Sequence, residues 1–121
     1  MESGEFEELV ARSLSSLPHD FRDKLENLEV EVRDFPSADD LQDAGVEGGV
    51  LLGLYRGVPL GHRGYHYQLV LPDTIYIYRK PVEEEARRSG TPVVEVVRRV
   101  VLHEIAHHFG IPDSRLKELG Y

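Results

Sequence analysis

One long apolar segment limits the folds open to this chain more than any other feature. Between Pro92 and Gly110, valine, leucine, isoleucine and phenylalanine occur on nearly every face of a helical projection. Valine favours strands, but about 18 residues, roughly 27 Å of helix, are too many for one strand. Thr91 is suited to be the N-cap, with Pro92 at the first helical position, and Gly110 is a typical helix end. The sequence therefore predicts a largely buried central helix.

Three ionisable residues near the end of this helix have the spacing of a metal-binding motif. His103 and His107 are four residues apart, so a helix presents both from one face. Both imidazoles can then bring a ring nitrogen to about 2.0–2.1 Å from one Zn²⁺. Glu104 lies about 100° around the helix and can take a proton from a bound water as general base. His108 points away from the His103 face, so a polar or core-edge role is expected for it.

A zinc site of this kind needs a third ligand, and Gly110 gives the chain a route to one. A glycine one turn after His107 can adopt a positive φ and reverse the chain, which would direct Asp113 at the same ion. Asp113 is equally suited to cap a final helix over Ser114–Leu119. The residues themselves leave ligand and cap open for Asp113.

The motif H-E-x-x-H-x-x-G-x-x-D resembles that of the zincin metallopeptidases, with the ligand spacing of their metzincin branch. The chain is more similar to a small bacterial family of zincin-like metallopeptidases described as minimal zincins. Three segments carry this resemblance: Leu51–Tyr55, Leu71–Arg79 and Leu102–Asp113. It covers most of the chain and implies a zincin-like fold and a Zn²⁺ site. It also implies a hydrolase, a minimal metalloprotease acting on peptides or proteins, with His103, His107 and Asp113 as metal ligands and Glu104 as the catalytic residue.

Two departures from the metzincin pattern keep other functions open. Metzincins carry a third histidine where this chain has Asp113, and they follow it with a methionine turn, whereas Met1 is the only methionine here. One alternative is therefore a zincin-like domain without catalysis, whose metal is structural or which serves protein interaction. The other is a zinc endoribonuclease of the family that matures ribosomal RNA. Those enzymes have three histidines at this spacing but normally lack the residue that Glu104 represents.

Composition and charge narrow the possible partners. The net charge is −8, and residues 1–50 carry 4 Lys and Arg against 14 Asp and Glu, while residues 51–121 carry 10 against 8. The acidic first half repels polyanions, so nucleic acid is an unlikely partner. No apolar run approaches the length of a membrane span, and the acidic beginning does not resemble a signal peptide. With no cysteine, a cytoplasmic location is the default expectation. The oligomeric state is left open.

Hydrophobic patterns place the remaining elements. Helices are expected at about residues 5–16, after Pro18, at Ala38–Asp43 with Ser37 as cap, and after Pro81; strands are expected from Leu28 to about Pro36, at Val50–Tyr55, near Gln68–Leu71 and at Thr74–Arg79. The fold class predicted from this order is α+β. We expect a single zincin-like domain over residues 1–121, with a small mixed sheet of about four strands packed against the central metal-binding helix.

Two segments are candidates for contact with a substrate. Zincins hold an extended substrate along an edge strand just before the metal helix, and the resemblance gives Thr74–Arg79 the right chain position. Tyr76 or Tyr78 would then line the groove; alternatively, this is an interior strand whose tyrosines pack. The loop between the strands carries a cluster that indicates either a binding surface or an ordinary polar loop: His62, Tyr65, His66 and Tyr67.

Overall fold

The computed structural model describes residues 1–46, 50–57 and 72–121, and it has the mixed α+β architecture that the sequence predicts. The predicted strand near Gln68–Leu71 and the His62–Tyr67 cluster lie outside the described residues. The elements in chain order are α1 Ser3–Ser15, α2 His19–Arg22, the 3₁₀ helix η1 Asp23–Asn27, β1 Leu28–Arg33, α3 Ala38–Asp43, β2 Gly53–Arg56, β3 Asp73–Tyr78, α5 Arg79–Ser89, α6 Val93–Phe109 and α7 Asp113–Glu118.

Three described strands form one mixed sheet in the order β1-β3-β2. β1 runs parallel to β3, and β2 runs antiparallel to it. The predicted alternation in β3 is confirmed, because Ile75 and Ile77 are fully buried on one face while Tyr76 and Tyr78 occupy the other. β3 is the central one of the three described strands, so of the two alternatives for Thr74–Arg79 the interior strand is confirmed and the edge strand is wrong. Pairing order depends on contacts between distant segments, which local patterns do not encode.

The central helix α6 lies against the isoleucine face of the sheet and contacts both β2 and β3. Seven of its residues are buried, most of them valines: Val96, Val97, Val100, Val101, Leu102, Ile105 and Ala106. It begins one residue later than predicted. Pro92 is the N-cap, with an extended ψ of 143°, and the Thr91 hydroxyl accepts a hydrogen bond from Ser89 instead. The predicted end is confirmed, since Gly110 has a φ of 70° and the Ile111 N–H donates to the Ala106 carbonyl.

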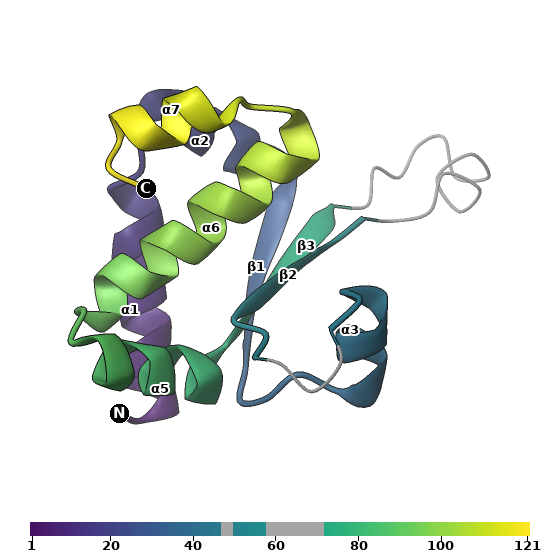
Figure 1. The fold of residues 1–121 in the computed structure, drawn as a ribbon, viewed down its shortest axis with the longest axis vertical. Coiled ribbons are helices and arrows are strands. Elements are labelled where there is room, and N and C mark those ends of the chain that lie inside the picture. Colours follow the sequence, from purple (N-terminus) through teal and green to yellow (C-terminus); the bar gives the residue numbers. More distant parts are fainter. Residues whose placement is uncertain (47–49, 58–71) are drawn as a thin grey trace.

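The other long helices complete the layer on this side of the sheet (Figure 1). α1 packs along α6 and buries Phe6 and Val10, and α5 packs on α6 through Val82 and Ala86. α7 closes the end of the layer with Leu116 buried. These residues and the inner face of the sheet form one hydrophobic cluster, which holds α6 rigidly in place.

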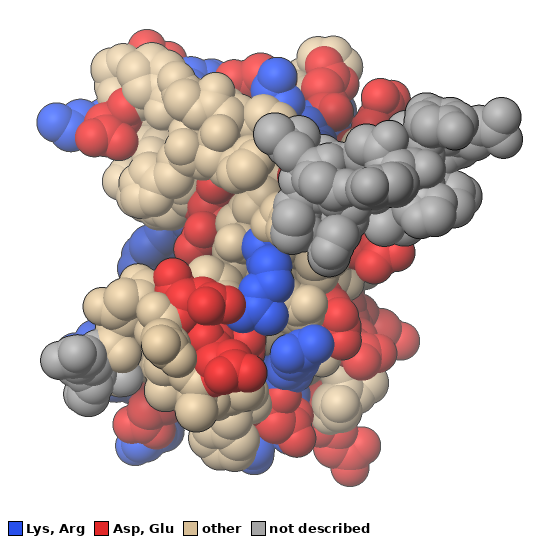
Figure 2. Space-filling model, turned by 90° about the vertical axis from the view of Figure 1, so that its right-hand side faces the viewer, with Lys and Arg blue, Asp and Glu red and all other residues tan. Residues whose placement is uncertain are grey.

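Of the helices that the structure describes, only the short helix α3 lies on the opposite side of the sheet (Figure 1). Its predicted cap is confirmed: Ser37 Oγ accepts from the Asp40 N–H, and an Asp40 carboxylate oxygen accepts from the Ser37 N–H. The same carboxylate also accepts from Tyr78 Oη at 2.9 Å and from Arg56 Nη2 at 3.0 Å. On the face that carries α3, basic and acidic side chains lie next to one another (Figure 2). Among the described helices, none combines the length and the apolar character needed to cross a bilayer.

Candidate active site

His103 and His107 project from the same side of α6, as their spacing predicts. Their ring centroids are 6.2 Å apart, with the ring planes at 72°. Two imidazoles that share one zinc at about 2.0–2.1 Å have centroids roughly 5 Å apart, so the separation of this pair is about 1 Å longer than a shared ion requires. His103 is half-buried and His107 is exposed. The helix therefore holds two nitrogen donors side by side at the surface.

The electrostatic environment of His103 favours the neutral form of its imidazole. Burial lowers the pKa of the imidazole, and the nearby His107 and Arg99 lower it further. The Asp113 carboxylate acts in the opposite direction on the same pKa, which shows that it lies within electrostatic range of His103. A neutral imidazole keeps a lone pair on one ring nitrogen, and only that form can bind a metal ion.

Glu104 faces β2, one of the two edge strands of the described sheet. Burial raises the pKa of its carboxyl group, while the charge of His107 and the backbone N–H of Tyr55, which donates a hydrogen bond to it, act to lower that pKa. The hydrogen-bond pattern between β2 and β3 explains why the Tyr55 N–H points toward α6. The Tyr78 N–H donates to the Leu52 carbonyl, so the alternation of an antiparallel pair turns the N–H and C=O of Gly53 and Tyr55 away from β3.

The strand beside Glu104 is therefore β2, not β3, and the expected roles of Tyr76 and Tyr78 change with it. Tyr78 is fully buried, with its hydroxyl donating to Asp40 on the far side of the sheet. Tyr76 lies on that same far side, with the Arg33 guanidinium 4.1 Å above its ring. Tyr78 cannot line a groove at α6, and Tyr76 is turned away from it.

Asp113 is not the helix cap that the sequence allowed. The N-cap of α7 is Pro112, and Asp113 is the first helical residue, with no side-chain capping hydrogen bond at that end. Its side chain is exposed and acts on the pKa of His103, as described above. Within residues 1–46, 50–57 and 72–121, no three His, Cys, Asp or Glu side chains are arranged to share an ion. The assignment of Asp113 as third ligand remains a prediction.

A group that the sequence reasoning missed surrounds Tyr55. Its ring stacks on His108, with centroids 3.7 Å apart and planes at 16°, and its hydroxyl donates to Asp73 at 2.6 Å. His108 Nε2 is 3.9 Å from the same Asp73 carboxylate. His108 follows Glu104 by one helical turn, and this i,i+4 spacing is the signal in the sequence that could have placed it on the Glu104 face. The stack fixes β2 against the end of α6.

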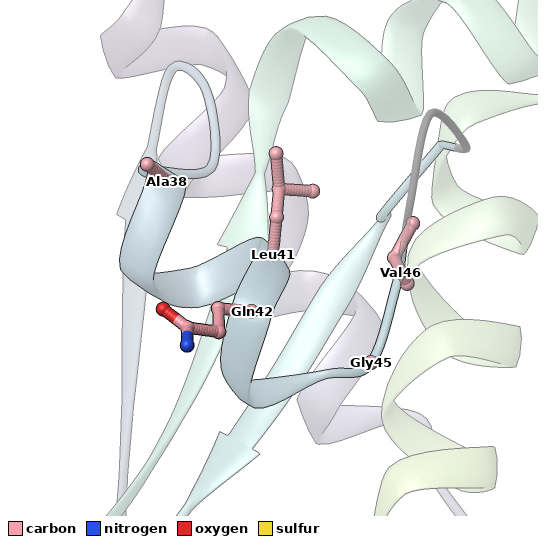
Figure 3. A pocket seen from close by; sticks show the side chains of 5 residues that line it. All are labelled: Ala38, Leu41, Gln42, Gly45 and Val46. Atoms are coloured by element: carbon pink, nitrogen blue, oxygen red, sulfur yellow. The ribbon is translucent and has the colours of Figure 1, made fainter.

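Two of the described cavities differ in the chemistry of the residues that line them. The larger, about 770 Å³, lies beside α3 and is lined by Ala38, Leu41, Gln42, Gly45 and Val46, as Figure 3 shows. No ionisable side chain is among these, so it offers no group for catalysis. The smaller, about 260 Å³, lies where β2 meets α6 and includes both His103 and Glu104 in its lining. The smaller cavity is the candidate active site.

Comparison with known proteins bears on the family and the fold of this chain. The family model described as zincin-like metallopeptidase matches residues 25–121, which include the three described strands and α6. A solved structure of a conserved hypothetical protein from Thermus thermophilus superposes with a TM-score of 0.58 at 28% sequence identity. The match covers 94% of this chain and 99% of that one. None of the curated proteins matches the sequence.

Proposed function

The chain belongs to the zincin-like metallopeptidase family, and from that premise we propose that it is a zinc-dependent peptidase that hydrolyses peptide bonds. His103, His107 and Asp113 are the proposed ligands. Two imidazoles and a carboxylate are a donor set that zinc accepts, and they leave a fourth position for water. When bound, zinc lowers the pKa of that water toward ~7 and polarises the substrate carbonyl.

One observation carries this proposal: Glu104 is held against the edge strand on the same turn of helix as the histidine pair. A general base must lie within reach of the proton that it removes. From its place beside β2, the Glu104 carboxylate can accept a proton from the attacking water and return it to the leaving amine. Burial raises the pKa of this carboxyl group, which makes the carboxylate a stronger base toward the attacking water.

The test is to measure zinc per chain and hydrolysis of a broad peptide panel for the native protein and for Glu104→Gln. We expect bound zinc in both proteins and loss of roughly 10²–10⁴-fold in turnover in the variant, because the base is gone while the ligands remain. His107→Ala is expected to lose zinc. His108→Ala is the matched control, because it removes the adjacent exposed histidine and is expected to keep the metal.

A zincin-like domain without catalysis is the second candidate, and the sequence supplies its support. Asp113 stands where metzincins carry a third histidine, and Met1 is the only methionine, so their methionine turn is missing. Zinc binding without turnover on any peptide of the panel would support that candidate. Cleavage of RNA, abolished by His107→Ala, would instead favour the endoribonuclease, which the acidic first half of the chain makes less favourable.

A further inference from the structure

The cavity beside Glu104 has the size and lining of a pocket for one aliphatic side chain. Its volume is about 260 Å³, below the roughly 300–1,000 Å³ typical of sites for whole small molecules. Leu51, Leu52, Gly53 and Val100 form an apolar wall, and His103 and Glu104 lie at the same cavity. A side chain seated here would belong to a residue next to the bond that Glu104 serves.

The backbone of Gly53 gives this pocket its shape. A Cβ added at Gly53 would lie 2.4 Å from Val100 Cγ1 and 3.0 Å from the Tyr76 carbonyl oxygen. Only the absence of a side chain lets the strand approach α6 so closely. The approach keeps the cavity narrow and places its apolar wall directly beside Glu104.

Arg99 adds a positive charge to the lining of the same cavity. It is exposed and sits one helical turn before His103. Its neighbour Arg98 is paired with Glu95 at 2.9 Å, but among the described side chains no carboxylate forms an ion pair with Arg99. A guanidinium binds a carboxylate with two parallel hydrogen bonds. The Arg99 guanidinium, at the rim of an apolar pocket, therefore favours ligands that carry a negative charge.

Building on the proposed function, we propose that this site selects peptides that place an aliphatic side chain in the pocket and a carboxylate on Arg99. The apolar wall recognises the side chain, and the charge of Arg99 recognises either a free C-terminal carboxylate or the side chain of an acidic residue. The substrate class is thus an aliphatic, acidic peptide segment, and Arg99 is a specificity-determining residue.

Binding can be measured apart from hydrolysis by NMR titration of Glu104→Gln, in which peptides are not consumed. Four acetylated tripeptides serve as probes: Ala-Leu-Ala with a free carboxylate, the same peptide as its amide, Ala-Leu-Glu amide, and Ala-Gly-Ala with a free carboxylate. Leucine is expected to bind about tenfold more tightly than glycine, because its side chain is buried. A carboxylate is expected to add about threefold to fivefold in affinity. Shifts should concentrate at Gly53 and Val100.

Adding Arg99→Gln should abolish the advantage of the carboxylate while keeping the preference for leucine. Arg12→Gln removes an exposed arginine on α1 and is the matched control, expected to keep both preferences. Tighter binding of the free-acid peptide than of its amide would identify the C-terminal carboxylate as the partner of Arg99. Tighter binding of the glutamate peptide would identify an acidic side chain instead. Equal affinities for acid and amide peptides, an advantage that survives Arg99→Gln, or no preference for leucine would overturn the inference. Peptidase activity is tested separately with the native protein, so either idea can fail without the other.

Discussion

Asp40 and Glu104 are both carboxylates packed against the same small sheet, but on opposite faces. Asp40 is 1% exposed and has partners on all sides: the Ser37 N–H, the Tyr78 hydroxyl and Arg56. For Glu104, the described residues supply the charge of His107 and the Tyr55 N–H. A buried carboxylate that is fully bonded stabilises the fold, whereas one that is only partly bonded keeps capacity to accept a proton.

The difference in bonding shifts the two pKa values in opposite directions: the pKa of Asp40 is lowered and that of Glu104 is raised. Burial acts to raise the pKa of Asp40, but the hydrogen bonds from Ser37 and Tyr78 and the charge of Arg56 outweigh it, so the net pKa is lowered. For Glu104 burial prevails and the pKa is raised. Asp40, on the α3 face, is therefore a structural carboxylate, and Glu104, on the α6 face, is the carboxylate available for chemistry.

Asp40→Asn is expected to have the largest effect on stability. An amide in this place loses the charge that faces Arg56 and turns an N–H₂ group toward donors, so the variant should lose about 3 kcal/mol of unfolding free energy. Urea denaturation measures the loss. Asp39→Asn, an exposed acid in the same helix, is the control and should change little. If both variants unfolded alike, Asp40 would not be a structural carboxylate.

The same contrast has a pH signature. Because the pKa of Asp40 is lowered by folding, its contribution is present above about pH 4 and is lost as the pH falls through the folded-state pKa. The gap in stability between the native protein and Asp40→Asn should therefore shrink progressively below about pH 4. Denaturation curves recorded from pH 7 downward test this. A gap that stayed constant would mean that the charge of Asp40 is not what stabilises α3.

Gly53→Ala tests the α6 side, with an intermediate effect. The added Cβ would lie 2.4 Å from Val100 Cγ1, so the strand and the helix must separate, at a cost of about 1–3 kcal/mol. Thermal unfolding gives the stability change, and binding of the leucine tripeptide should weaken in parallel. Gly4→Ala has open space around the new methyl group and should be neutral or slightly stabilising. Full stability in Gly53→Ala would argue against the close approach of β2 and α6.

Local features of this fold were readable from the sequence, and long-range pairing was not. Gly110 ends α6 with a positive φ and Ser37 caps α3, because both depend on residues a few positions away. The His103–Glu104–His107 arrangement follows in the same way from helix geometry. The central place of β3 depends on β1 and β2, which are distant in sequence, and so does the burial of Tyr78 on Asp40. That is why β2, with Tyr55 and Gly53, replaced β3 as the strand beside Glu104.

Glu104→Gln should have the smallest effect on stability, although it makes the same chemical change as Asp40→Asn. Replacing a partly desolvated carboxylate by a neutral amide removes a cost of burial and loses little bonding, so without metal the unfolding free energy should change by less than about 1 kcal/mol. Urea denaturation of the metal-free proteins measures it beside Asp40→Asn. A loss as large as that of Asp40→Asn would place Glu104 among the structural carboxylates. A small change accompanied by loss of turnover would instead separate its part in catalysis from any part in folding.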